Sequence, residues 1–405
     1  MTATAAATEP AATEIHASRP AAPRRRKGPG RLAALDGLRG IAAVVVVLHH
    51  LLLIAEPHLK ADFGTQPFGL WWMLERTPLK VLTSGREAVM VFFVLSGLVV
   101  ALPALRKANF SWSGFLAGRF VRLFLPAWGA VVVATALFFL VPRVPEQVTG
   151  GSWLARSAQT DWHWVHLLKE YTLMIGSVQY DNALWTLRWE FAFSLVLPVY
   201  LVLAMALHRW WLPVGALTLG LAVLGHYAEI QALSYLPVFF LGTLIAARLH
   251  YIRKWGRRPG RGWVFAGLLT VSALVLVISW MLAPIAPAGT GANHALLGME
   301  VAGATGIVIV PVGGGWFGAL LTRRLPQFLG RTSFSLYLLH IPVITTLAWL
   351  LGDWNWPVLF PRGLTAALLS GWLFYRWVEK PLHRLARAAN RQSVALVASF
   401  IRARA

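Results

Sequence analysis

The chain has 405 residues, of which 57% are hydrophobic and only 13% charged. These proportions exclude an ordinary soluble domain, which carries about 25% charged residues. There is no cysteine, which excludes disulfides, thiolate catalysis and cysteine-ligated metals. The formal charge of +21 would suggest a nucleic-acid ligand in a soluble protein, but no nucleic-acid-binding motif is present. Apolar runs of about 20 residues, each long enough to cross a bilayer, recur along the chain and predict an all-α polytopic membrane bundle.

Residues 1–30 consist largely of Ala, Pro, Thr and Arg without apolar periodicity, and they predict a disordered basic cytoplasmic tail. Ten membrane spans are then predicted in residues 31–385, followed by a basic cytoplasmic tail at 386–405. The spans are 32–54, 86–105, 120–141, 183–207, 211–228, 232–249, 263–283, 295–320, 332–351 and 360–378.

The distribution of Lys and Arg predicts the orientation of these spans. With the N-terminus inside, 27 of the 37 basic residues fall on the cytoplasmic side and eight on the outer side. The positive-inside rule therefore predicts both termini in the cytoplasm of a multi-pass protein in the inner (plasma) membrane. The outer loops are rich in Trp, which fits an interfacial aromatic belt or a stacking surface for a sugar or lipid headgroup.

The first span, in "RLAALDGLRGIAAVVVVLHH", carries ionisable groups where their burial is costly. A helix of 3.6 residues per turn places Arg39 and His50 on one face, about 16 Å apart along the axis, with Asp36 one turn before Arg39. Asp36 and Arg39 also fit an ion pair at the cytoplasmic end, and His50 an interfacial histidine. An ionisable group inside a membrane marks a functional site by default, and a neutral histidine can still act as a base.

Six stretches of the sequence resemble, in order, motifs of the membrane-bound acyltransferase-3 family. They are "LDGLRGIAAVVVVLHH", with an Arg, ten residues and a His; "VMVFFVLSGLVV"; "FLAGRFVRLFLP"; "ALWTLRWEFAFSLVLP"; and the closing pair "RTSFSLYLLHIPV" and "YRWVEKPLHR". His50 rather than His49 fits the first motif. Met90 stands where many relatives carry an acidic residue, so no role is transferred to that position.

The resemblance implies an O-acyltransferase that moves an acyl group, often acetyl, from cytoplasmic acyl-CoA to a hydroxyl of a glycan, lipid or small-molecule acceptor. Acyl-CoA is then a co-substrate, and no metal is implied. Arg119 and Arg122 share a helix face and suit the donor phosphates, with Arg39 extending the positive path. The alternative for this pair is positive-inside anchoring. His50 is the predicted general base, grouped with Arg39, Asp36 and Glu190 as catalytic residues.

Four residues are assigned to acceptor binding: Trp185, Glu190, Tyr337 and His340. Glu190 is the one carboxylate within its predicted span, so it fits a partner of His50 or of the acceptor, or an ion pair with an Arg that joins two helices. His340 lies mid-span before Pro342, and its alternative is a hydrogen-bonded packing histidine. A transporter or flippase of a lipid-linked sugar is the rival function. High Ala, Arg and Trp usage suggests a GC-rich bacterium, while the oligomeric state stays open.

Overall fold

The computed structural model describes residues 2, 32–106, 110–157, 160–174 and 179–402. The predicted disordered tail therefore lies outside the described residues, apart from Thr2. Within the described ranges every regular element is a helix, and there are no strands. The prediction of an all-α polytopic membrane bundle is confirmed.

Eight helical segments in the described part of the chain are long and apolar enough to cross a membrane. They are built on α1 (Ala33–Phe63), α3 (Gly85–Arg106), α4 (Trp112–Leu140), α7 (Trp185–Ala206), α9 (Gln231–Gly256), α12 (Gly291–Gly313), α14 (Arg324–Leu351) and α15 (Trp356–Phe374). Helices form at the other two predicted spans as well, but α8 (Trp211–Tyr227) and α10 (Arg261–Leu276) are shorter. The count of ten spans and the orientation of the termini remain predictions.

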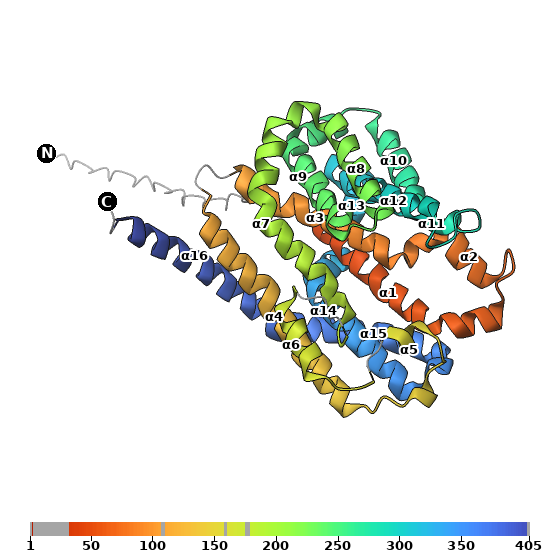
Figure 1. Cartoon of the computed structure of the whole chain (residues 1–405). Coiled ribbons are helices and arrows are strands. Elements are labelled where there is room, and N and C mark those ends of the chain that lie inside the picture. Colours follow the sequence, from red (N-terminus) through yellow and green to blue (C-terminus); the bar gives the residue numbers. More distant parts are fainter. Residues whose placement is uncertain (1, 3–31, 107–109, 158–159, 175–178, 403–405) are drawn as a thin grey trace. The chain divides into compact units, whose positions relative to one another are not determined.

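The remaining elements are short or lie at the ends of the bundle. They are α2 (Leu70–Arg76), α5 (Trp153–Ser157), α6 (Trp164–Thr172), α11 (Ile278–Met281), α13 (Gly315–Leu321) and α16 (Lys380–Arg402), with 3₁₀ turns at Pro78–Leu82, Pro145–Gln147, Asn182–Leu184, His208–Trp210 and Asp353–Asn355. A π-helical turn, Tyr375–Glu379, joins α15 to α16. The residues predicted as a C-terminal tail belong to α16 as far as Arg402, and α16 lies along α4 (Figure 1).

Helix α1 lies at the centre of the arrangement, against α14, α3 and α15 (Figure 1). Glycines allow its first turns to touch neighbouring backbone. A Cβ on Gly37 would lie 2.0 Å from the Leu321 carbonyl oxygen, and one on Gly40 would lie 2.3 Å from the Gly330 nitrogen. The close approach at Gly40 fixes α1 against α14, the two helices that carry His50 and His340.

Helix α4 begins eight residues before its predicted start, because the Ser111 side chain caps it by accepting a hydrogen bond from the Gly114 amide at 3.2 Å. Arg119 consequently lies within α4, as Arg122 does, rather than at the end of a connecting segment. Helix α1 likewise continues past the predicted residue 54 and ends at Gly64, whose φ of 66° suits glycine.

Candidate active site

Five of the predicted site residues line one pocket near the first turns of α1 and α4: Asp36, Arg39, Arg119, Arg122 and Glu190. We call it the arginine pocket. The side chains come from α1, α4 and α7, and segments of α3 and α14 complete the wall. The pocket thus gathers three guanidinium groups from two helices that the sequence separates by 80 residues.

Arg119 is fixed by α7. Its Nη2 donates to Glu190 Oε2 at 2.9 Å and its Nε donates to Ser194 Oγ at 3.1 Å. The Ser194 hydroxyl donates in turn to the Glu190 carbonyl at 2.7 Å, while Ser96 donates to Glu190 Oε1 at 3.4 Å. Only 10% of the Arg119 side chain is exposed, and this charge is matched by the Glu190 carboxylate and the Ser194 hydroxyl.

The other two arginines differ from Arg119. Within the described ranges, neither Arg39 nor Arg122 forms an ion pair or a side-chain hydrogen bond, although both line the pocket. Arg39 therefore does not pair with Asp36, the alternative that the sequence left open. Arg119 is close enough to both for their like charges to repel. Two guanidinium groups without a carboxylate partner, placed together in a pocket, form an anion-binding arrangement.

A second pocket shares Arg39, Glu190 and Phe334 with the arginine pocket and leads on to Tyr337. We call it the tyrosine pocket. The buried Thr186 hydroxyl donates to the Tyr337 hydroxyl at 3.0 Å. The two pockets are narrow, with about 60 and 20 Å³ of free space. The three shared residues place the two pockets next to each other, between the first turns of α1 and Tyr337 of α14.

His50 and His340 meet beyond the tyrosine pocket. Their rings lie 5.0 Å apart, and His340 Nε2 is 3.3 Å from His50 Nδ1. His340 is fully buried, and its Nδ1 contacts the Tyr337 carbonyl at 2.7 Å. The ring of His50 also contacts Trp153 of α5. His50 thus faces other side chains of the bundle, and His340 on α14 is its polar side-chain partner.

The hydrogen bonds assign the tautomers of this pair. His50 Nδ1 lies 2.9 Å from the Val46 carbonyl, which can only accept, so Nδ1 carries the proton. The same reasoning places the proton of neutral His340 on its Nδ1, opposite the Tyr337 carbonyl. The one Nδ1 proton of His50 is then shared between the Val46 carbonyl and His340 Nε2 at 3.3 Å, and His50 Nε2 keeps its lone pair. A neutral imidazole with a lone pair on one nitrogen and a fixed proton on the other is arranged as a general base.

Some predicted residues are separated from this group. Glu190 contacts Arg119 and not His50, so the structure has the inter-helix ion pair that the sequence offered, and a role of Glu190 toward the acceptor stays a prediction. Trp185 packs on Phe93 and Tyr235. His49, the neighbour of His50, turns away and donates from Nδ1 to the Thr83 carbonyl at 2.9 Å.

Neither Ser96 nor Ser194 is among the site residues predicted from sequence, although both bond to the Arg119–Glu190 pair. The four-residue step from Glu190 to Ser194 on one helix face was the available signal. In the described part of the chain, no group of three His, Cys, Asp or Glu side chains is placed to hold a metal ion.

Comparison with known proteins agrees with the resemblance. A family model described as an acyltransferase domain matches residues 32–376. O-acetyltransferase PaAT-1 of Phomopsis amygdali is 29% identical over 390 residues, which cover 81% of this chain and 75% of that protein. Acyltransferase MdmB of Streptomyces mycarofaciens is 28% identical over 388 residues, with 88% and 92% covered. Nodulation protein 10 of Rhizobium leguminosarum bv. viciae is 27% identical over 347 residues, with 76% and 85% covered.

No solved structure matches the chain. The family match spans nearly all of the described membrane helices and both candidate pockets, and it favours the enzyme over the transporter. The protein is therefore a multi-pass membrane acyltransferase, and the chain belongs to the acyltransferase-3 family.

Proposed function

We propose that the enzyme is an acyl-CoA-dependent O-acyltransferase of the plasma membrane, which moves an acyl group, acetyl in the simplest case, to a hydroxyl of a glycan, glycolipid or related acceptor. The observation that carries the proposal is the shared wall of the two pockets. Arg39, Glu190 and Phe334 line both pockets and connect the free guanidinium groups with Tyr337, whose carbonyl orients His340 beside His50.

The donor enters at the arginine pocket. Arg39 and Arg122 have no carboxylate partner among the described residues, and guanidinium groups bind phosphate oxygens well. Arg119 is engaged by Glu190 and Ser194, so it holds the pocket wall rather than the donor. The distance of about 16 Å from Arg39 to His50 along α1 suits an extended pantetheine arm. Because the pockets are narrow, the side chains that line them must move when the donor binds.

The chemistry follows from the lone pair on His50 Nε2. His50 takes the proton of the acceptor hydroxyl, the acceptor oxygen bonds to the thioester carbonyl carbon, and the carbon–sulfur bond breaks. The CoA thiolate leaves and takes the proton from His50. Tyr337, whose hydroxyl faces the tyrosine pocket, is the candidate donor to the carbonyl oxygen. A covalent acyl-histidine is the alternative route to the same products.

The test compares two neighbouring histidines in the full-length protein, reconstituted in nanodiscs with radiolabelled acetyl-CoA and an envelope extract as acceptor source. His50→Gln is expected to lose transfer by at least about a hundredfold, the scale of general-base catalysis. His49→Gln, on the same helix but directed at Thr83, is the matched control and is expected to keep transfer. CoA binding should remain in both variants. Full turnover by His50→Gln would remove the mechanism, and movement of the acceptor without modification would favour transport.

A further inference from the structure

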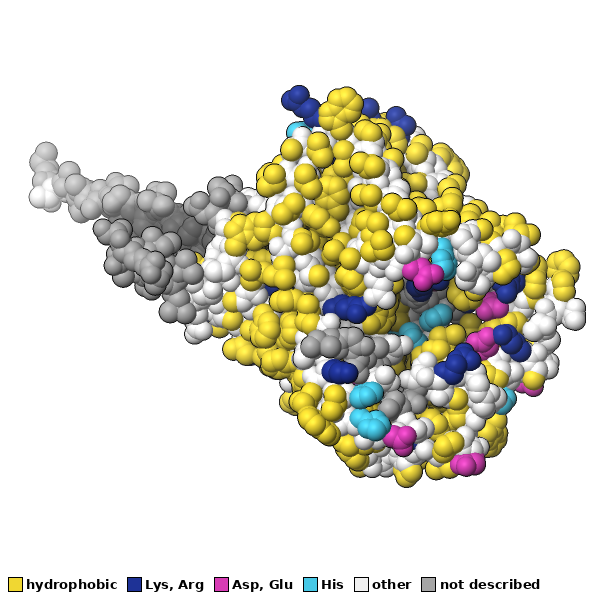
Figure 2. Space-filling view, in the orientation of Figure 1, with side chains coloured by type: hydrophobic (Ala, Val, Ile, Leu, Met, Phe, Trp, Pro, Cys, Tyr) yellow, Lys and Arg dark blue, Asp and Glu magenta, His cyan; other side chains and the backbone are white. Residues whose placement is uncertain are grey.

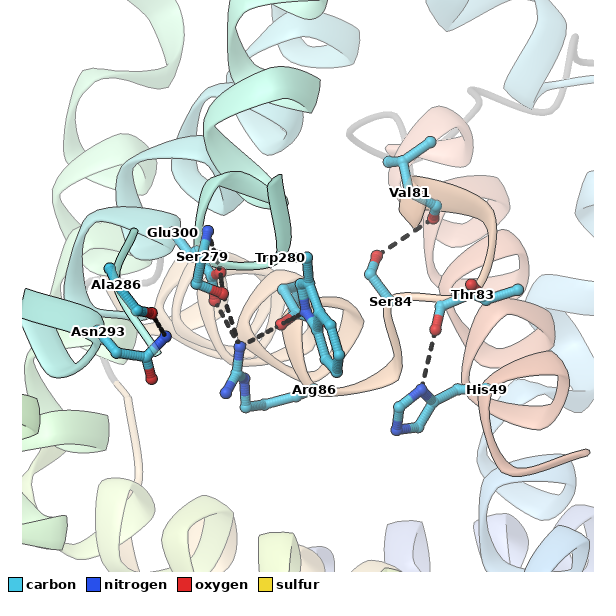
Figure 3. Close-up of polar contacts among 11 residues, drawn as sticks. His49, Val81, Thr83, Ser84, Arg86, Ser279, Trp280, Ala286, Asn293 and Glu300 are labelled. Carbon is cyan, nitrogen blue, oxygen red and sulfur yellow. Dashed lines mark hydrogen bonds and ion pairs between the residues drawn. The ribbon is translucent and has the colours of Figure 1, made fainter. Parts of the chain in front are cut away.

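A charged network that takes no part in the proposed chemistry lies where α3 meets α11 and α12 (Figure 3). Arg86, the second residue of α3, donates from Nη2 to Glu87 at 2.5 Å and to Glu300 at 3.0 Å. Trp280 donates from its indole N–H to Glu87 at 3.0 Å, and Ser279 bonds to Glu300 through both its amide and its hydroxyl. Both carboxylates are buried, with side chains 0% and 2% exposed, whereas 38% of Arg86 remains accessible.

Arg86 and Glu300 form one wall of a pocket of about 250 Å³, which we call the Arg86 pocket. It shares no residue with the arginine or tyrosine pocket. Its other walls come from α8, α9 and the first turns of α12, and they include His226, Tyr235 and His294. Figure 2 shows acidic, basic and histidine side chains around a hollow in one face of the molecule, while apolar side chains cover the surface over α7 and α9.

The composition of the Arg86 pocket indicates the ligand that it suits. Most of its lining side chains both donate and accept hydrogen bonds or carry a charge, so an apolar ligand would leave them unpaired. The one guanidinium is already neutralised by Glu87 and Glu300, and Glu229 adds a further carboxylate at the edge. A phosphate or carboxylate would therefore be repelled. A ring rich in hydroxyls, neutral or carrying an amino group, satisfies these groups.

One wall adds an apolar surface. Tyr235 belongs to an aromatic group, with ring centroids 5.3 Å from Trp185 and 5.4 Å from Trp189. The ring of Tyr235, the one phenol or indole among the described residues that line the pocket, stands beside charged and amide side chains and suits a sugar ring, which has apolar C–H faces and polar edges. The volume of about 250 Å³ is slightly below the roughly 300 Å³ at which drug-sized sites begin, and this favours a single ring.

The Arg86 pocket is also linked to the proposed base. Gly85, the residue before Arg86, lies so close to His49 that a Cβ on it would be 2.5 Å from the imidazole ring. His49 is the neighbour of His50, with ring centroids 5.2 Å apart. The backbone that carries Arg86 therefore lies against His49, the residue before His50, at the end of α3 opposite to Ser96 of the arginine pocket. A molecule held by Arg86 would approach His50 from the side opposite to the donor.

We propose that the Arg86 pocket is the acceptor site, and that it selects a sugar-like ring that is uncharged or bears an amino group over phosphorylated or carboxylated rings. The inference rests on the proposed acyl transfer for its role, but the binding and its charge preference can be measured without turnover. Glu300 and the rim residue His294 are expected to contact the ring. Trp185, predicted from sequence to bind the acceptor, would support Tyr235 from behind.

The experiment measures binding of three methyl glycosides, one neutral, one amino and one uronate, to the full-length protein in nanodiscs without acyl-CoA, by saturation-transfer NMR. The neutral and amino glycosides are expected to bind and the uronate to bind at least about tenfold more weakly. Glu300→Gln should weaken binding of the amino glycoside at least about tenfold, and His294→Ala severalfold. Glu146→Gln, an exposed carboxylate in the 3₁₀ turn Pro145–Gln147, is the matched control and should bind as the wild type does.

Equal binding of the uronate, or wild-type binding by His294→Ala and Glu300→Gln, would overturn the proposal. If Glu300→Gln does not fold, the proposal is tested by glycoside binding to His294→Ala and by the preference of the wild type for the neutral and amino glycosides over the uronate. In turnover, the same variants should raise KM for the acceptor and leave KM for acyl-CoA unchanged. Selective binding without acyl transfer would refute the proposed function and keep the pocket. Acyl transfer with an unchanged acceptor KM in both variants would keep the function and refute the pocket.

Discussion

Replacing Gly40 with alanine tests the contact that holds the histidine pair together. A Cβ at Gly40 would lie 2.3 Å from the Gly330 nitrogen and 2.6 Å from the Leu329 carbonyl carbon, whereas ordinary contacts begin at 3.4 Å. The backbones of α1 and α14 would therefore have to separate by about 1 Å, because a packed interior has no slack to absorb the methyl group. Overpacking of this kind costs about 1–3 kcal/mol.

The same separation of α1 and α14 should also disrupt the contact between His50 and His340. His50 lies ten residues further along α1 than Gly40, and His340 lies ten residues after Gly330 on α14, so the two contacts are on the same helix pair. The nitrogen–nitrogen distance of 3.3 Å is already near the limit for a hydrogen bond, and a separation of 1 Å would break it. We expect a loss of transfer of about a hundredfold, since a misplacement of this size has that effect in other enzymes.

Thermal unfolding of the full-length protein, followed by its 20 tryptophans, measures the first effect without any substrate. Gly220→Ala in α8 is the matched control, because a Cβ there meets nothing within 4 Å. That control should be neutral or stabilise by about 0.5–1 kcal/mol through reduced backbone entropy, so the two substitutions should shift the melting temperature in opposite directions. Equal melting temperatures for Gly40→Ala and the wild type would refute the close contact between α1 and α14.

Three further outcomes are expected. Burial raises the pKa of Glu170 in α6 from an ordinary 4.5 to about 7, so between these pH values the folded protein holds a proton that the unfolded chain has released. The free energy of unfolding should therefore fall by up to about 3 kcal/mol as the pH rises from 4.5 to 7. Melting curves of Glu170→Gln should lose this pH dependence. Glu190→Gln leaves Arg119 buried without its counter-charge and should destabilise by about 3–5 kcal/mol in chemical unfolding, with Glu190→Gln/Arg119→Met largely restored. Tyr337→Phe removes only the hydroxyl that bonds to Thr186, and it should lower kcat about a hundredfold in the transfer assay while the melting temperature changes little.

Hydropathy predicts where the long helices lie, because a membrane imposes both their length and their composition. It does not predict where they end. Helix α1 continues for nine residues beyond its predicted end at residue 54, since the helix ends at Gly64 and not where the apolar run stops. The early start of α4 depends on the Ser111 cap, a signal that the sequence contains and that hydropathy ignores.

In the candidate site, too, the sequence predicts local spacing but not the contacts between distant helices. The spacing of Arg39 and His50 is local, so helical periodicity is sufficient to place them on one face. The partner of His50 is 290 residues away, and no periodicity indicates that His340 of α14 reaches it. Arg188 lies two residues before Glu190 in the sequence, yet Glu190 pairs with Arg119 of α4. Arg188 instead donates a hydrogen bond to Gln231 of α9. These pairings depend on how the helices pack.

The arginines that line the arginine pocket and the Arg86 pocket fall into two kinds, and the difference bears on what the pockets bind. Arg119 and Arg86 are each held by carboxylates and hydroxyls, as the cost of an unpaired charge away from water requires. Arg39 and Arg122 have no such partner in the described part of the chain, and the lone pair of His50 Nε2 has none assigned either. In the proposed reaction, the donor phosphates would pair with Arg39 and Arg122, and the acceptor hydroxyl would pair with the lone pair of His50 Nε2.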